Sequence, residues 1–285
     1  MNEHGSIARL VLKHARDAFG SQAECDRQAL PLGFTAVPDF HAAIREYDAF
    51  AAAVSASGAV VSFLPADPRV GLDSIYVRDA SLMTPRGAVL CRMGKPLRKT
   101  EPDVQGEAFR ATGITVLGSI EPPGRIEGGD VVWFDEHTVA VGRGYRTNDE
   151  GIRQFTAVLG PGVDVVVVPL PHHRGPDDVF HLMSIISPVD RDLAVVYSPL
   201  MPVPFREWLV ARGVALVEVP EPEFDSMGAN VLAIAPRRCV MVHGNPGTKS
   251  ALERVGATVT EYEGREISLK GGGGPTCLTR PILRA

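Results

Sequence analysis

The chain has 285 residues, of which 45% are hydrophobic and 22% are charged, and its formal net charge is −5. This composition is typical of a globular protein with a hydrophobic core, and the length allows one large domain or two ordinary ones. Basic residues do not cluster, so we expect no nucleic-acid partner. No apolar run approaches the length needed to cross a bilayer, so we expect no membrane partner either.

The four cysteines, at positions 25, 91, 239 and 277, form no CxxC pair and suggest no disulfide framework. The N-terminal residues do not combine a basic start with an apolar segment, so no secretory signal is predicted. A reducing compartment fits both observations, and we expect the protein to be cytoplasmic.

The first forty residues fit no regular pattern along their whole length. Met1–Phe19 has some helical pattern, and Gln22–Pro38, which contains two prolines and a glycine, is predicted to be a long loop. Long loops in compact domains are often lids or binding loops. Residues 20–38 are therefore a candidate lid.

A clear helix signal follows. Asp39 is a typical N-cap residue, and apolar side chains recur at helical spacing up to Ser57. The apolar run Ala59–Leu64 then predicts a strand.

From residue 79 onward the chain repeats a strand, a turn and a second strand at intervals of roughly fifty residues. In each case apolar and β-branched runs are bounded by turn-forming residues, which is the signature of a hairpin. The repeats begin at Asp79, Asp130, His181, Asn230 and Cys277.

A helical segment and one further strand separate successive hairpins. The predicted helices are Gln105–Thr112, Asp149–Leu159, Pro204–Arg212 and Pro246–Val255. The strands after them are Ile114–Leu117, Val163–Val168, Val214–Val219 and Ala257–Glu261.

Counting the N-terminal set, the pattern predicts five ββαβ units in an α/β fold, arranged as a five-bladed α/β propeller in one catalytic domain, residues 1–285. A doubly wound α/β sheet also alternates helices and strands, but it lacks a hairpin in every unit. In a propeller, the residues that begin the repeats would meet at one central site.

Four glycines and a proline lead directly into Cys277. Glycine allows unusual backbone angles and close approach of another group, so this turn would hold the thiol tightly without covering it. That arrangement suits a nucleophile, since the thiolate is the reactive form. The alternative is an ordinary buried thiol before a last strand.

Three other motifs carry polar residues that could act with this cysteine. They are Asp73–Asp79, Arg125–Asp130 and Phe180–Leu182. Taken singly, the first can be read as a surface ion pair, the second as a turn and the third as a partly buried histidine. No closed set of metal ligands is visible, and no P-loop or GxGxxG motif follows a strand, so we expect neither a metal nor an organic cofactor.

Taken together, Asp79, Glu127-Gly-Gly-Asp130, His181 and the glycine turn before Cys277 resemble the guanidine-modifying enzymes of the pentein superfamily. That superfamily includes the dimethylarginine dimethylaminohydrolases, arginine and agmatine deiminases, and amidinotransferases. The resemblance covers roughly residues 40–285 and follows the order of the motifs. It also implies a five-bladed α/β propeller.

The resemblance implies a role for each matched residue. Cys277 would attack the guanidinium carbon and form a covalent thiouronium intermediate. His181 would act first as general acid for the leaving amine and then as base for water. Glu127 and Asp79 would hold the guanidinium through charge-assisted hydrogen bonds, and a bound cation would favour the thiolate of Cys277.

Two further segments resemble the dimethylarginine hydrolases, in which arginines bind the α-carboxylate of the substrate. The corresponding candidates here are Arg98 and Arg146, for which surface charge is the alternative reading. Asp73 is expected near the guanidinium or the lid, and Asp130 is counted among the substrate-binding residues.

The resemblance therefore implies a hydrolase that converts methylated arginine to citrulline and methylamine or dimethylamine. Position 183 is methionine where deiminases and amidinotransferases usually have an acid, which favours this reading; the all-glycine turn is closer to the deiminases. A deiminase or dihydrolase of arginine or another guanidino compound, or an amidinotransferase, stays open. Ribosome-binding propellers of the superfamily lack the cysteine–histidine pair. The expected partner is a small guanidino substrate, and a homo-oligomer is left open.

Overall fold

The computed structural model describes all residues from 1 to 285 and contains five separate three-stranded sheets. In every sheet the central strand has one antiparallel and one parallel neighbour. The fold is thus α/β with five small mixed sheets. The predicted unit of a hairpin, a helix and a third strand is confirmed.

Four of the sheets follow one another along the chain. Their strands are β3 (Ser81–Thr84), β4 (Gly87–Leu90) and β5 (Val116–Ser119); β6 (Val131–Asp135), β7 (Thr138–Arg143) and β8 (Asp164–Pro169); β9 (Ile186–Asp190), β10 (Leu193–Val196) and β11 (Ala215–Glu218); and β12 (Leu232–Ala235), β13 (Arg238–Val242) and β14 (Thr258–Tyr262).

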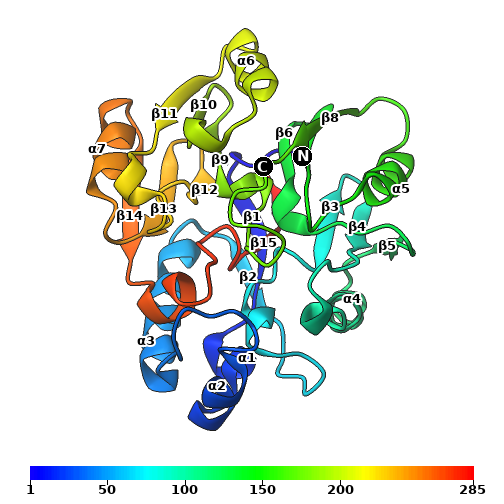
Figure 1. Cartoon of the computed structure of the whole chain (residues 1–285), viewed down its shortest axis with the longest axis vertical. Helices are drawn as coiled ribbons and strands as arrows, with labels where there is room; N and C mark the ends of the chain where they lie inside the picture. Colours follow the sequence, from blue (N-terminus) through cyan, green and yellow to red (C-terminus); the bar gives the residue numbers. More distant parts are fainter.

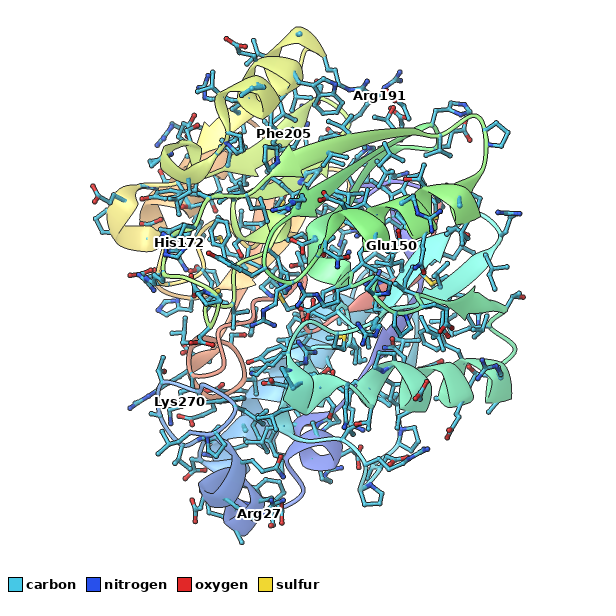
Figure 2. The ribbon with its side chains drawn as sticks, turned by 45° about the vertical axis from the view of Figure 1, so that its right-hand side comes forward. Arg27, Glu150, His172, Arg191, Phe205 and Lys270 are labelled. Atoms are coloured by element: carbon cyan, nitrogen blue, oxygen red, sulfur yellow. The ribbon has the colours of Figure 1, made fainter.

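One helix precedes the third strand of each of these sheets. The four helices are α4 (Glu101–Ala111), α5 (Asp149–Leu159), α6 (Val203–Ala211) and α7 (Pro246–Arg254). They lie at the periphery of the molecule together with α3 (Phe40–Ser55), and the sheets lie between them and the centre (Figure 1). The labelled residues Arg27, Glu150 and Phe205 mark three of the outer helices (Figure 2). All four helices were predicted from the sequence, with ends that differ by a few residues.

The fifth sheet joins the two ends of the chain. Strand β1 (Ile7–Leu12) lies between β15 (Arg280–Arg284), to which it is antiparallel, and β2 (Val60–Phe63), to which it is parallel. The prediction of helical pattern across Met1–Phe19 was therefore wrong for residues 7–12. Their apolar run is mostly buried, and a short buried run does not distinguish helix from strand by its periodicity.

Three helices connect β1 to β2. They are α1 (Ala15–Phe19), α2 (Gln22–Gln28) and α3 (Phe40–Ser55). The prediction of a loop over Gln22–Pro38 was wrong in its first part, because Ser21 caps α2 by accepting a hydrogen bond from the backbone N–H of Glu24 at 3.2 Å. The helix after Asp39 is confirmed, and the Asp39 carboxylate accepts from the N–H of Ala42 at 2.7 Å.

The residues that begin the repeats lie in short turns before the strands rather than in the strands themselves. His181 precedes a 3₁₀ turn, Leu182–Ser184, and donates its backbone N–H to the Ser184 hydroxyl at 3.1 Å. Cys277 lies three positions before β15 and follows a π-helical turn at Arg265–Leu269. The strand predicted from His181 therefore starts later, at Ile186.

The first strands of the sheets, and the turns before them, face the centre of the molecule, where both chain ends lie (Figure 1). The backbone N–H of Ala285 donates to the Ser6 carbonyl at 2.8 Å. None of the helices is both long enough and apolar enough to cross a bilayer. This arrangement brings turns from different sheets together around one central region.

Candidate active site

Two adjoining pockets lie where these turns meet. The outer pocket has a volume of about 400 Å³ and the inner one about 20 Å³, and both are lined by His181, Cys277 and the glycine turn. The inner pocket is also lined by most of the residues predicted for substrate binding, namely Asp73, Asp79, Arg98 and Arg146. Its volume is enough for about one water molecule.

The glycine turn holds Cys277 through close contacts that side chains would block. A Cβ on Gly273 would lie 2.4 Å from the Tyr76 ring, and a Cβ on Gly274 would lie 2.5 Å from the Asn230 amide. Asn230 accepts from the N–H and hydroxyl of Thr276, at 3.0 and 2.9 Å, and its amide nitrogen lies 3.5 Å from the Cys277 sulfur. The turn and Asn230 thus fix the position of the thiol.

The thiol of Cys277 is protonated in this environment at neutral pH. Burial raises its pKa, and the negative charge of Asp79 raises it further, whereas the hydrogen bond from Thr276 and the charge of Arg78 act in the opposite direction. Because only the thiolate is strongly nucleophilic, this cysteine needs a positive charge nearby before it can react.

His181 pairs with a fully buried carboxylate. Its Nε2 lies 2.8 Å from Glu127 Oε2, and a Cβ on Gly129 would lie 2.5 Å from the opposite ring nitrogen, Nδ1. Burial lowers the pKa of His181, but the charges of Asp130 and Asp79 and the hydrogen bond to Glu127 together raise it to about 9. The imidazole therefore holds a proton at neutral pH.

Glu127 is ionised despite its burial. Burial opposes ionisation, but the hydrogen bond and charge of His181 and the charge of Arg146 hold the pKa of the Glu127 carboxyl below its ordinary value. Its Oε1 accepts from the N–H of Gly94 at 2.7 Å, and the Arg146 guanidinium lies 3.3 Å from its Oε2. The carboxylate is thus held between His181 and Arg146.

Asp79 is held in a similar way. Its Oδ1 accepts from the N–H of Gly129 at 3.1 Å, and its Oδ2 accepts from Arg98 Nη1 at 2.7 Å. The rest of the Arg98 guanidinium bonds to the Glu101 carboxylate, at 2.8 Å from Nη2, and to two backbone carbonyls. Arg98 was expected to bind the α-carboxylate of the substrate, but most of its donors are already bound by protein groups.

Asp130 also lies elsewhere than the sequence suggested. It lines neither pocket; its Oδ1 accepts from the N–H of Leu182 at 2.9 Å and its Oδ2 from the Thr147 hydroxyl at 2.6 Å. Both oxygens are therefore bound by protein groups. These contacts hold the turn that carries His181.

Tyr76 and Lys95 are among the residues of the inner pocket that the sequence did not single out. Tyr76 packs against the glycine turn, and Lys95 donates from Nζ to Asp73 at 2.6 Å and to the Leu32 carbonyl. Lys95 thereby links the pocket to the segment that follows α2. The repeat pattern gave no signal for either residue, because neither begins a strand–turn–strand unit.

The segment after α2 borders the outer pocket. Gly33 and Thr35 line it, and the N–H of Thr35 donates to the Lys270 carbonyl at 2.8 Å. Lys270, which lies beside the N-terminal helices (Figure 2), donates from Nζ to the Val37 carbonyl at 2.9 Å. This segment is fastened to the turn that carries the cysteine.

Three groups of the site could hold a cation on distance alone. One ligand atom each from Asp79, Glu127 and His181 lies within 4.8 Å of the others. The expectation that no metal is required remains a prediction.

His172 contacts the Tyr145 hydroxyl through Nδ1 at 2.6 Å and lines neither pocket.

The chain matches the family model described as "N,N dimethylarginine dimethylhydrolase, eukaryotic" over residues 39–284. A dimethylarginine dimethylaminohydrolase of Streptomyces coelicolor is 32% identical over 222 residues, which are 76% of this chain and 78% of the relative. The corresponding enzyme of Pseudomonas aeruginosa is 29% identical over 244 residues, which are 85% and 89% of the two chains.

A solved structure gives the same result for the fold. The Pseudomonas aeruginosa enzyme, in a mutant complexed with citrulline, superposes with a TM-score of 0.78 at 25% identity, covering 98% of this chain and 100% of that one. The likeness therefore extends over nearly all of both chains. This chain belongs to the dimethylarginine dimethylaminohydrolase family, within the pentein superfamily.

Proposed function

We propose that this protein hydrolyses the guanidino group of methylated arginine, releasing citrulline and methylamine or dimethylamine. The observation that carries the proposal is the shared pocket: Cys277, His181 and Asp79 line one small cavity, and Glu127 bonds to the histidine. A planar cation fits this set, because carboxylates can bind its N–H edge while sulfur approaches its face.

The first half of the reaction forms a thiouronium. The guanidinium binds at Asp79 and Glu127, and its charge lowers the pKa of the Cys277 thiol, which loses its proton to solvent. The thiolate attacks the guanidinium carbon and makes a C–S bond. His181, which is protonated at neutral pH, donates its proton to the departing amine as the C–N bond breaks.

The second half restores the enzyme. His181, now neutral, removes a proton from water, and the hydroxide attacks the thiouronium carbon. The C–S bond breaks, and the departing sulfur takes up the proton of the new hydroxyl group, which restores the Cys277 thiol and leaves neutral citrulline as the product. The carboxylate of Glu127 stabilises the charged imidazole each time it forms.

The methylated substrate is supported by the lining of the outer pocket. Met183 lies there beside His181 and is only 3% exposed. It packs in a hydrophobic cluster and offers no charge to a free guanidinium, as an acid at this position would. Deimination or dihydrolysis of arginine is the second candidate, favoured by the all-glycine turn. Transfer of the amidino group to an amine instead of water is the third.

For the α-carboxylate of the substrate we propose Arg146, which lines the inner pocket. Arg98, by its contacts with Asp79 and Glu101, is proposed as a positioning residue, and so is Asp130. Asp73 is proposed to act through Lys95, to which it is paired at 2.6 Å.

We also propose that the five sheets are the blades of an α/β propeller in one domain, residues 1–285. Within residues 20–38, the part after α2 would act as a lid, because Lys95 and Lys270 fasten it beside the pocket. Four free cysteines agree with a cytoplasmic location. Light scattering would show whether the chain forms a homo-oligomer.

A panel of guanidino compounds tests the proposed function. Citrulline formation is measured with monomethylarginine, dimethylarginine and arginine. With agmatine and small guanidino acids, the formation of a ureido product or the release of an amine or ammonia is measured. We expect the highest kcat/KM for a methylated arginine. A clear preference for free arginine supports the deiminase instead, and inactivity on every compound by folded protein contradicts the enzymatic proposal.

Gly129→Ala is expected to lower kcat about 100-fold, because a shift of the reacting groups by about 1 Å costs that much. The new Cβ would lie 2.5 Å from His181 Nδ1 and 3.0 Å from Asp79 Oδ1, so the imidazole must move. Steady-state kinetics measure the effect, with Gly113→Asn as control, since nothing lies within 4 Å of a Cβ there. Equal activity of the two variants would contradict the placement of His181.

A further inference from the structure

A second cavity lies apart from the active site, between the N-terminal residues and β15. Its volume is about 220 Å³, and the charged residues in its wall are Glu3, Arg78, Arg280 and Arg284. None of the residues that line it also lines the outer or inner active-site pocket. It is therefore a separate space, and the chemistry proposed above makes no use of it.

The charges around this cavity do not balance. Glu3 is the one carboxylate in its wall, and it pairs with Arg78 through two hydrogen bonds of 3.2 Å. Arg280 and Arg284 have no acidic partner; Arg284 Nη1 bonds to the carbonyls of Gly5 and Ala233, at 2.6 and 2.8 Å. Three guanidinium groups and one carboxylate leave a surplus of positive charge.

Several donors of these arginines also lack a hydrogen-bond partner. They are Arg280 Nε, Arg284 Nε and Arg284 Nη2, all shielded from solvent. Arg280 is only 5% exposed. A buried donor without an acceptor is costly, and more so when it carries charge. Unpaired buried groups of this kind require an explanation, such as a bound ion.

The electrostatics agree with the geometry. Burial lowers the pKa of Arg280 to about 9, with the positive charge of Arg78 contributing in the same direction. Burial likewise lowers the pKa of Arg284 to about 10; the charge of Glu3 acts in the opposite direction, and the charge of Arg78 adds to the effect of burial. The cations are crowded together and would be relieved by a negative charge between them.

We propose that this cavity binds a small oxyanion, a phosphate or a carboxylate, through Arg280 and Arg284. Guanidinium groups match the oxygens of both anions in geometry and charge. A water molecule occupies about 30 Å³ of liquid, so the cavity has room for such an anion and some water. Water alone would satisfy hydrogen bonds but leave the surplus charge.

Arg78 connects this cavity to the active site. Its Nε donates to the Thr276 carbonyl at 3.0 Å, and its backbone N–H donates to the Cys277 carbonyl at 3.2 Å. Its other nitrogens hold Glu3 at the cavity. An anion bound in this cavity would therefore be separated from the turn that holds the thiol by two residue-to-residue contacts.

The test measures binding of inorganic phosphate to the full chain by calorimetry and by thermal unfolding, against sodium chloride at equal ionic strength. A parallel arm uses acetate to separate phosphate from carboxylate recognition. The expected result is a rise in Tm with phosphate or acetate beyond that with chloride, and a saturable binding isotherm of one site per chain.

Variants locate the site. Arg284→Gln, at a half-buried position, is expected to weaken the Kd about tenfold or more, since it removes a charge-assisted contact. Glu3→Gln removes the competing carboxylate and is expected to tighten binding. Arg191→Gln, an exposed arginine (Figure 2), is the matched control and should leave the Kd unchanged.

Two results would overturn the proposal. One is that phosphate and acetate act no differently from chloride on the wild-type chain, which would mean that water fills the cavity. The other is binding that Arg284→Gln leaves unchanged, which would place the anion elsewhere. Circular dichroism of each variant shows that it has folded. If Arg284→Gln proves unstable, Glu3→Gln tests the same site, because it should tighten anion binding instead of weakening it.

Discussion

Replacing Cys277 by serine is expected to lower turnover by about 10³-fold or more, because loss of a covalent nucleophile removes the whole two-step route. The serine hydroxyl is similar in size to the thiol and keeps the contact with Asn230, so the fold should persist. Citrulline formation and the Tm are measured together. The expected pattern is a lost activity with a Tm close to that of the wild type.

Cys239→Ala is the matched control for this variant. Cys239 is 1% exposed and packs in a hydrophobic cluster beside Val231 and Met241, where burial raises the pKa of its thiol to about 12. The control should lose some stability and keep its kcat. A Cys277→Ser protein that turns over at the wild-type rate would show that another group attacks the substrate.

Replacing Glu127 by glutamine is expected to lower kcat by about 10² to 10⁴-fold, the range typical of general acid–base catalysis. The same variant should move the alkaline limb of the pH–rate profile to lower pH. The general acid works while His181 is protonated, so activity falls as pH rises through its pKa. Without the Glu127 carboxylate, its hydrogen bond and charge no longer raise that pKa, although the charges of Asp130 and Asp79 still do, so the fall begins at lower pH.

The measurement is kcat/KM for a methylated arginine between pH 6 and pH 10, with Glu150→Gln as control. Glu150 lies on α5 (Figure 2), pairs with Arg153 at 2.7 Å and lines neither active-site pocket. The control should reproduce the wild-type profile. An alkaline limb that stays in place in Glu127→Gln would mean that the Glu127 carboxylate does not set the protonation of His181.

The repeat was visible in the sequence because each unit has its own local signals. Apolar periodicity predicts helices such as α5, and turn residues between β-branched runs predict hairpins such as β6–β7. Strand β1 carries no such signal. It pairs with β15 from the other end of the chain and with β2, and these pairings make residues 7–12 a strand.

The convergence of the site residues on one pocket was also predictable from the sequence, whereas the hydrogen-bond and ion-pair partners of the side chains were not. Equal spacing brings Asp79, His181 and Cys277 to corresponding places in three of the five units, and all three line the inner pocket. Spacing does not tell which way a long side chain turns. Arg98 was expected to face a substrate, but Glu101, three residues later in the next helix, binds it at 2.8 Å.

Lys95 shows a second limit of the sequence. Its contacts with Asp73 and with Leu32 join residues far apart in the chain, and neither partner suggests the pairing by its spacing. A lysine between a glycine and a proline reads as an exposed loop residue. Tertiary contacts alone place it in the pocket.

Acid-quenched mass spectrometry of the protein during turnover of a methylated arginine tests the account most directly. It predicts an adduct on the peptide that contains Cys277, with the mass of the substrate less methylamine or dimethylamine, which disappears once the substrate is consumed. Sustained citrulline production with no adduct at Cys277, or with the adduct on another cysteine, would contradict it.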